Sequence, residues 1–169
     1  MALASSTALA SSTALAVAAD SPKALIAAIY KRAAAGKGDS GGQFVWLRAS
    51  SKQRYLSASL IRLWAAADAK VAPGDMGEPG FDPVTNSQDP MVRAPKVAVE
   101  KQDGGSATVA ATFRSHNNES VTVRYDLMLD RGAWKIDDIR GTTDGQAWSL
   151  RELLRNFLSL MEEQKKKRG

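Results

Sequence analysis

The chain has 169 residues, of which 44% are hydrophobic and 24% charged, with one histidine and no cysteine. This composition is typical of one soluble globular domain, and the lack of cysteine excludes disulfides, thiol catalysis and lipid attachment through cysteine. Lys165, Lys166, Lys167 and Arg168 contribute four of the five net positive charges, so residues 1–164 hold 19 basic and 18 acidic residues. We therefore expect a basic tail at 165–169, no nucleic-acid-binding face, no metal and no cofactor.

Residues 1–20 form a leader of low complexity, in which Ala-Leu-Ala-Ser-Ser-Thr occurs twice. No charge precedes Asp20, and residues 16–19 are small, as a signal peptidase requires. These features favour a signal peptide and a periplasmic or secreted protein. Lys and Arg are missing from the start, so a plain flexible leader on a cytoplasmic protein is the alternative. No stretch reaches the ~20 apolar residues of a membrane-spanning helix.

Two helices are predicted in the first half of the chain. Ser21-Pro22 suits a helix start and Gly36 a helix end, which predicts a helix over 22–35. A second helix is expected over 51–69, because its apolar residues recur at helical spacing. Its Tyr55 and Trp64 are candidates for a pocket lining, although aromatic residues on such a stripe usually belong to the core.

The segment 73–95 holds five of the six prolines and is predicted to be a long ordered loop. Its Asp82, Gln88 and Asp89 are candidate ligand-binding residues, because loops held by a rigid scaffold often bind ligands. The alternative is that the two acids, each directly before a proline, only stabilise turns. We expect all three to lie near the end of the strand that carries Trp134, with Gln88 turned inward and hydrogen-bonded to hold the loop.

The segment 95–140 contains runs of alternating apolar and polar residues, separated by turn signals such as Asp103-Gly104-Gly105 and Arg131-Gly132. This pattern predicts a four-stranded antiparallel meander, extended by short strands near Phe44 or Val84. A final helix over 149–165 is predicted by the capping box that begins at Ser149. The fold class is therefore α+β, in one domain over 21–164.

The strand-and-loop motifs resemble those of an uncharacterised family of exported bacterial domains, over residues 22–161. The matching pieces are Phe81-Asp82-Pro83, Asn86-Ser87-Gln88-Asp89, Tyr125-Asp126-Leu127, Trp134-Lys135-Ile136-Asp137-Asp138-Ile139 and Ser149-Leu150-Arg151. That family is similar to the nuclear transport factor 2-like superfamily, in which a bent sheet forms a cone around a helix. The resemblance implies a pocket between sheet and helices. It also implies a possible homodimer through the outer sheet face, where Arg124, Asp126 and Met128 are expected.

Two functions are compatible with these features. The first is a binding or interaction domain of the bacterial envelope, with an unknown small molecule or protein as its partner. The second is an isomerase, lyase or hydrolase that uses a carboxyl group in an apolar pocket, as ketosteroid isomerase does on the same superfamily fold. Asp138 is the candidate for that acid, because strand parity places it on the inward face with Trp134. The alternative is that Asp138 only accepts structural hydrogen bonds or pairs with an arginine.

Overall fold

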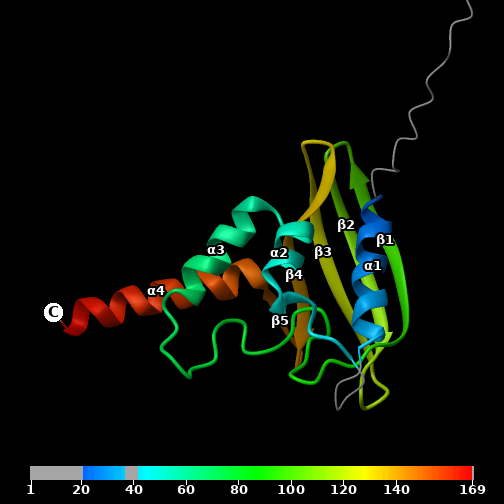
Figure 1. Cartoon of the computed structure of the whole chain (residues 1–169). Coiled ribbons are helices and arrows are strands. Elements are labelled where there is room, and N and C mark those ends of the chain that lie inside the picture. Colours follow the sequence, from blue (N-terminus) through cyan, green and yellow to red (C-terminus); the bar gives the residue numbers. More distant parts are fainter. Residues whose placement is uncertain (1–20, 37–41, 169) are drawn as a thin grey trace, which may run out of the picture.

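The computed structural model describes residues 21–36 and 42–168. The leader, and with it the expectation of a signal peptide, lies outside these residues. The fold is α+β, with helices packed against a curved, open antiparallel sheet in which the five strands lie side by side in chain order (Figure 1). The predicted α+β class and antiparallel meander are thus confirmed. None of the helices in the described ranges is long and apolar enough to cross a membrane.

The elements come in the order helix, loop, helices, long loop, sheet and helix. They are α1 (Pro22–Ala34), the 3-10 turn η1 (Val45–Leu47), α2 (Ala49–Tyr55), α3 (Ala58–Asp68), β1 (Arg93–Asp103), β2 (Ser106–Arg114), β3 (Ser120–Asp130), β4 (Ala133–Thr143), β5 (Gln146–Ser149) and α4 (Leu150–Arg168).

The helix predicted over 51–69 is in fact two helices, α2 and α3. Leu56 takes an extended conformation and forms a bridge with Ile136 of β4, and the Ser57 N–H donates to the Ile136 carbonyl at 2.8 Å. The Ser57 side chain then caps α3 by accepting from the Leu60 N–H at 3.0 Å. Pairing with the sheet therefore interrupts an apolar pattern that continues through both helices.

A fifth strand, β5, extends the predicted meander. It follows the turn Asp144-Gly145, in which both residues have positive φ (51° and 78°), as two-residue hairpin turns require. The short strands expected near Phe44 and Val84 are absent from the described chain. The first region forms η1, and the second has only an isolated bridge between Asp82 and Ser87.

The buried face of the sheet is filled by α1. The Tyr30 ring lies 5.4 Å from Phe113 and 6.1 Å from Tyr125, and all three side chains are almost fully buried. The Tyr125 hydroxyl donates to the Tyr30 hydroxyl at 3.1 Å, which in turn donates to the Val84 carbonyl at 2.8 Å. This chain of bonds ties sheet, helix and proline-rich loop together. The three aromatic side chains pack between the sheet and α1 at this point.

Candidate functional site

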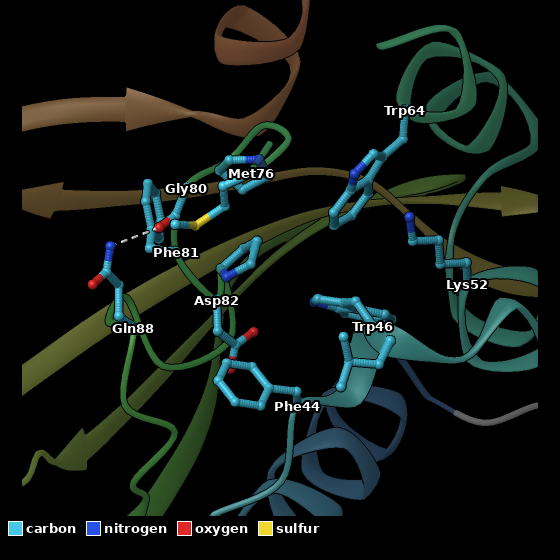
Figure 2. Close-up of a pocket in the computed structure, with 12 residues that line it drawn as sticks. Phe44, Trp46, Lys52, Trp64, Met76, Gly80, Phe81, Asp82 and Gln88 are labelled. Atoms are coloured by element: carbon cyan, nitrogen blue, oxygen red, sulfur yellow. Dashed lines mark hydrogen bonds between the residues drawn. The ribbon is translucent and has the colours of Figure 1, made fainter. Parts of the chain in front are cut away.

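A cleft of about 490 Å³ lies between the helices of the first half and the proline-rich loop (Figure 2). We call it the aromatic cleft, because aromatic side chains stand on both of its walls. Its lining residues are Phe44, Trp46 and Leu47 at η1, Lys52 of α2, Trp64 of α3, and Met76, Pro79, Gly80, Phe81, Asp82, Pro83 and Gln88 of the loop.

The helical wall is fixed by packing behind it. Trp46 and Trp64 are both buried, and the Trp46 and Tyr55 rings pack edge to face with their centres 6.1 Å apart. The Lys52 ammonium sits 3.9 Å from the centre of the Trp64 ring and 3.4 Å from an Asp68 oxygen. Trp64 is thus held between the core and a cation, which orients one face of its indole.

The opposite wall depends on Asn86, a residue that sequence reasoning did not single out. Its side-chain amide donates to the Thr142 carbonyl at 2.9 Å, and its oxygen accepts from Thr143 Oγ1 at 2.9 Å and Trp148 Nε1 at 2.8 Å. Asn86 also has φ of 54°, a conformation that Asn tolerates better than most residues. Asn86 therefore anchors the loop to the end of β4, where the sequence predicted the loop to lie.

Asp82 contributes the only carboxyl group among the residues that line the aromatic cleft. Its side chain is 5% exposed, and its two oxygens accept from the Val84 N–H at 3.1 Å and Thr85 Oγ1 at 3.0 Å. Burial raises the pKa of Asp82 to about 6, and these hydrogen bonds only partly oppose that rise. No ion pair among the described residues includes Asp82.

The Trp46 ring nitrogen is a second unusual group of the cleft. It is buried and has no hydrogen-bond partner in the described structure. Figure 2 shows this nitrogen turned toward the middle of the cleft, on the side of Asp82. A buried donor without an acceptor costs free energy, and most native structures have few of them. Among the described residues, the cleft therefore holds both a carboxyl group without an ion-pair partner and a donor without an acceptor.

The other predicted site residues are distributed over several places. Gln88 lines the cleft and donates to the Gly80 carbonyl at 3.1 Å, but its side chain is exposed, so the expected inward orientation is wrong. Asn86 does the anchoring that was assigned to Gln88. Asp89 is exposed and lines a separate polar groove at the end of the sheet. Tyr55 and Trp134 are buried core residues outside the cleft lining.

The inward orientation predicted for Asp138 is also wrong. A β-bulge at Asp137 interrupts the pairing of β4 with β3, so Ile136 and Ile139 are both fully buried although three residues apart. Asp138 instead pairs across the strands with Asp126 and accepts bonds from Ser149 Oγ at 2.6 Å and the Arg151 N–H at 3.0 Å. It stabilises the start of α4 and does not line the aromatic cleft.

Asp137, the bulge residue, holds three elements together. Its carboxylate accepts from Ser57 Oγ at 2.6 Å and from the Arg151 guanidinium, which also bonds the Asp137 carbonyl and Ser59. Burial alone raises the pKa of Asp137, but the bonds from Ser57, Arg151 and Ser59 bring it below its ordinary value. This cluster joins α3, β4 and α4, and we call it the Asp137 clamp.

No protein-family model matches the chain, and no curated protein sequence matches it. Solved structures do resemble it. A chain of the type VI effector–immunity complex Tae3–Tai3 from Ralstonia pickettii is 21% identical, with a TM-score of 0.55 over 75% of this chain and 99% of that one. A protein of unknown function from Bacteroides thetaiotaomicron is also 21% identical, with a TM-score of 0.44 over 69% of this chain and 86% of its own.

A phospholipid-binding protein from Ralstonia solanacearum, solved with a phospholipid, is 18% identical with a TM-score of 0.35 over 80% of this chain and 65% of its own. At these identities the Tae3–Tai3 likeness shows the shared fold alone, and the other two likenesses are weaker still. The relation to the nuclear transport factor 2-like superfamily stays a prediction.

Proposed function

We propose that this chain is a binding domain, which holds part of a partner molecule in the aromatic cleft. The observation that carries the proposal is the cleft itself: about 490 Å³ lined mainly by apolar side chains, with a few polar groups among them. Binding sites usually combine such an apolar lining with a small number of polar groups that orient the ligand. A protein partner is favoured by one further fact, that a similar fold occurs in an effector–immunity complex.

The proposal can be tested with two rim residues that are not needed for the core. Phe44 is 37% exposed and Met76 is 72% exposed, so Phe44→Ser and Met76→Ser should leave the fold intact. We expect a library of small aromatic and aliphatic fragments, screened by ligand-observed NMR, to give hits that bind wild type and lose at least fivefold in affinity in both variants.

Leu160 provides the matched control, because it is 55% exposed and lies on α4, outside the cleft lining. Leu160→Ser removes a comparable exposed apolar side chain and should keep the affinity of every hit. If no fragment binds, or if the hits bind Phe44→Ser and Met76→Ser as well as wild type, the cleft is not the binding site.

An enzymatic function of the predicted type is the second candidate, and Asp82 takes the place of Asp138 in it. A carboxyl group with a pKa of about 6 in an apolar site can act as a general acid or base near neutral pH. Both of its oxygens already accept hydrogen bonds, which favours the binding proposal. An enzyme would convert a bound ligand in a pH-dependent way, and Asp82→Asn would abolish turnover without abolishing binding.

We also infer export to the periplasm or the cell exterior, supported by the small and uncharged residues before Asp20. N-terminal sequencing of the protein made in a bacterial host checks this. A mature chain that starts near Ala19 or Asp20 supports export, and a soluble cytosolic protein that retains Met1 contradicts it.

Homodimerisation through the outer sheet face remains a proposal of its own. Arg124 pairs with Glu100 at 2.9 Å, and Arg140 pairs with Asp126 at 2.6 Å, so charges on this face are balanced within one chain. Exposed Met128, at 39%, would lie at such an interface. Light scattering on Met128→Lys and wild type tests it, since a sheet dimer should dissociate at least tenfold more readily in the variant.

A further inference from the structure

The aromatic cleft contains a negative charge that the described protein does not neutralise. Asp82 is 5% exposed, and with a pKa of about 6 it is mostly ionised at pH 7. Buried charged groups in proteins are nearly always paired, because removing an isolated ion from water is costly. The one cationic side chain of the lining, Lys52, has Asp68 as its partner. A cationic group of a ligand would therefore neutralise the charge on Asp82.

The walls of the cleft suit an organic cation. The electron-rich faces of aromatic rings attract cations, and Phe44, Trp46, Trp64 and Phe81 all line this site. Lys52 already shows the interaction, with its ammonium 3.9 Å from the centre of the Trp64 ring. An anionic ligand, such as a phosphate, a fatty acid or a nucleic acid, would instead meet the charge of Asp82 and lose affinity.

The Trp46 N–H adds a second requirement, which is a hydrogen-bond acceptor on the ligand. This donor is buried and has no acceptor among the described residues. It faces the middle of the cleft (Figure 2). A ligand that completes the site must therefore carry an acceptor close to its cation. An extended peptide segment has this combination, because each basic side chain is attached to a main chain that carries carbonyl groups.

We propose that the aromatic cleft receives an arginine side chain from an extended segment of a partner protein. The guanidinium lies against the Asp82 carboxylate and the aromatic walls, and a main-chain carbonyl beside that arginine accepts from Trp46 Nε1. Arginine suits the site better than lysine, because its planar guanidinium stacks on aromatic rings and is more weakly hydrated. This inference rests on the proposed function and names the chemistry of the partner.

The first experiment selects phage-displayed random heptapeptides on wild type and on Asp82→Asn. Asparagine keeps the side-chain shape and one acceptor for the Val84 N–H, but it has no charge. We expect arginine at one fixed position among peptides selected on wild type, next to apolar residues. On Asp82→Asn this preference should disappear.

The second experiment uses one selected peptide and the same peptide with citrulline, the uncharged isostere, in place of arginine. Calorimetric titration should show at least tenfold weaker binding of the citrulline peptide to wild type, and no such difference on Asp82→Asn. At pH 5 the arginine peptide should lose most of its advantage on wild type, because Asp82 is then protonated. Tyr30 and Tyr125, the titratable groups beside Asp82, stay neutral here, since burial raises the pKa of both. The pH titration uses wild type alone, so it tests the contribution of the Asp82 charge to binding even if Asp82→Asn folds poorly.

The two levels of the proposal fail in different ways. Selected peptides that lack arginine, or that bind the citrulline form equally well, overturn the inference. If their binding still depends on Phe44 and Met76, the proposed binding function stands. If no peptide and no fragment depends on these two residues, the binding function fails as well.

Discussion

The proline-rich loop buries the carboxyl group of Asp82, and the Asp137 clamp partly buries that of Asp137. The two carboxyl groups differ in their bonding partners and in their pKa. Asp137 accepts bonds from Ser57 and Arg151, and these bonds hold its pKa below the ordinary value. Asp82 accepts from main-chain N–H groups and the Thr85 hydroxyl, and burial raises its pKa to about 6. Arg151 balances the first charge, whereas no side chain in the described ranges forms an ion pair with the second.

This difference separates a structural acid from a candidate functional one. A buried ion that is fully bonded supports the fold, and removing one partner costs stability. A buried ion without a counterion lowers stability wherever it is ionised, so its presence needs another reason. Acidic residues that lie in clefts and have a strongly shifted pKa are often functional for this reason. The aromatic cleft, and not the Asp137 clamp, is therefore the candidate functional site.

The largest effect is expected from Asn86→Ala, which removes the anchor of the loop. Three hydrogen bonds are lost, and alanine must adopt a φ of 54°, so we expect the free energy of unfolding to fall by about 4 kcal/mol. Urea denaturation followed by tryptophan fluorescence measures this change. Asn86→Gly, which tolerates the same φ, should lose about 1 kcal/mol less. An effect below about 1 kcal/mol in both variants would mean that the loop is held elsewhere.

The next effect is a pH dependence that Asp82 introduces. Its folded pKa of about 6 exceeds the ordinary 3.8, so the protonated form favours the folded state. The contribution is fully present below pH 3.8 and is lost as pH rises through 6, by about 3 kcal/mol for a shift of this size. The stability of wild type relative to Asp82→Asn should therefore fall between pH 4 and pH 7. A constant difference across this range would show that folding does not raise the pKa of Asp82.

A smaller loss is expected when the Asp137 clamp is broken. Arg151→Met removes the guanidinium that bonds the Asp137 carboxylate and carbonyl. The Asp137 side chain is 37% exposed, so solvent limits the cost to about 1.5 kcal/mol. NMR titration should show the pKa of Asp137 rising in the variant. Arg155→Met, an exposed position on the same helix, is the control and should change stability by less than about 0.5 kcal/mol. Equal losses in both variants would exclude a specific role for the clamp.

The sequence predicted the fold class, the meander and the helix starts at Ser21 and Ser149, because these depend on local spacing and capping. It did not predict the bulge at Asp137, which turns Asp138 away from the core, because strict two-residue alternation was assumed through β4. The three-residue spacing of Ile136 and Ile139 is the trace that the bulge leaves in the sequence. The aromatic cleft joins side chains from residues 44–88, whose pairing depends on tertiary packing. Asp82 and Trp64 were recognised as candidates, but their neighbour Trp46 was not.

The smallest effect is expected from Gln88→Ala, and it separates anchoring from binding within the loop. The sequence favoured Gln88 as the residue that holds this segment, which would make the substitution costly. In the structure its side chain is exposed, and its one hydrogen bond, to the Gly80 carbonyl, can be replaced by water. We therefore expect the free energy of unfolding to change by less than about 0.5 kcal/mol.

Gln88 nevertheless lines the aromatic cleft, and its side-chain oxygen is able to accept a bond from a ligand. Gln88→Ala should weaken the cleft-dependent fragments and peptides by twofold to tenfold, while Leu160→Ser leaves them unchanged. Thermal unfolding and calorimetric titration on the same samples measure both quantities. A loss of stability as large as that of Asn86→Ala would instead make Gln88 a second anchor, and the division of the loop into an anchoring and a binding residue would be wrong.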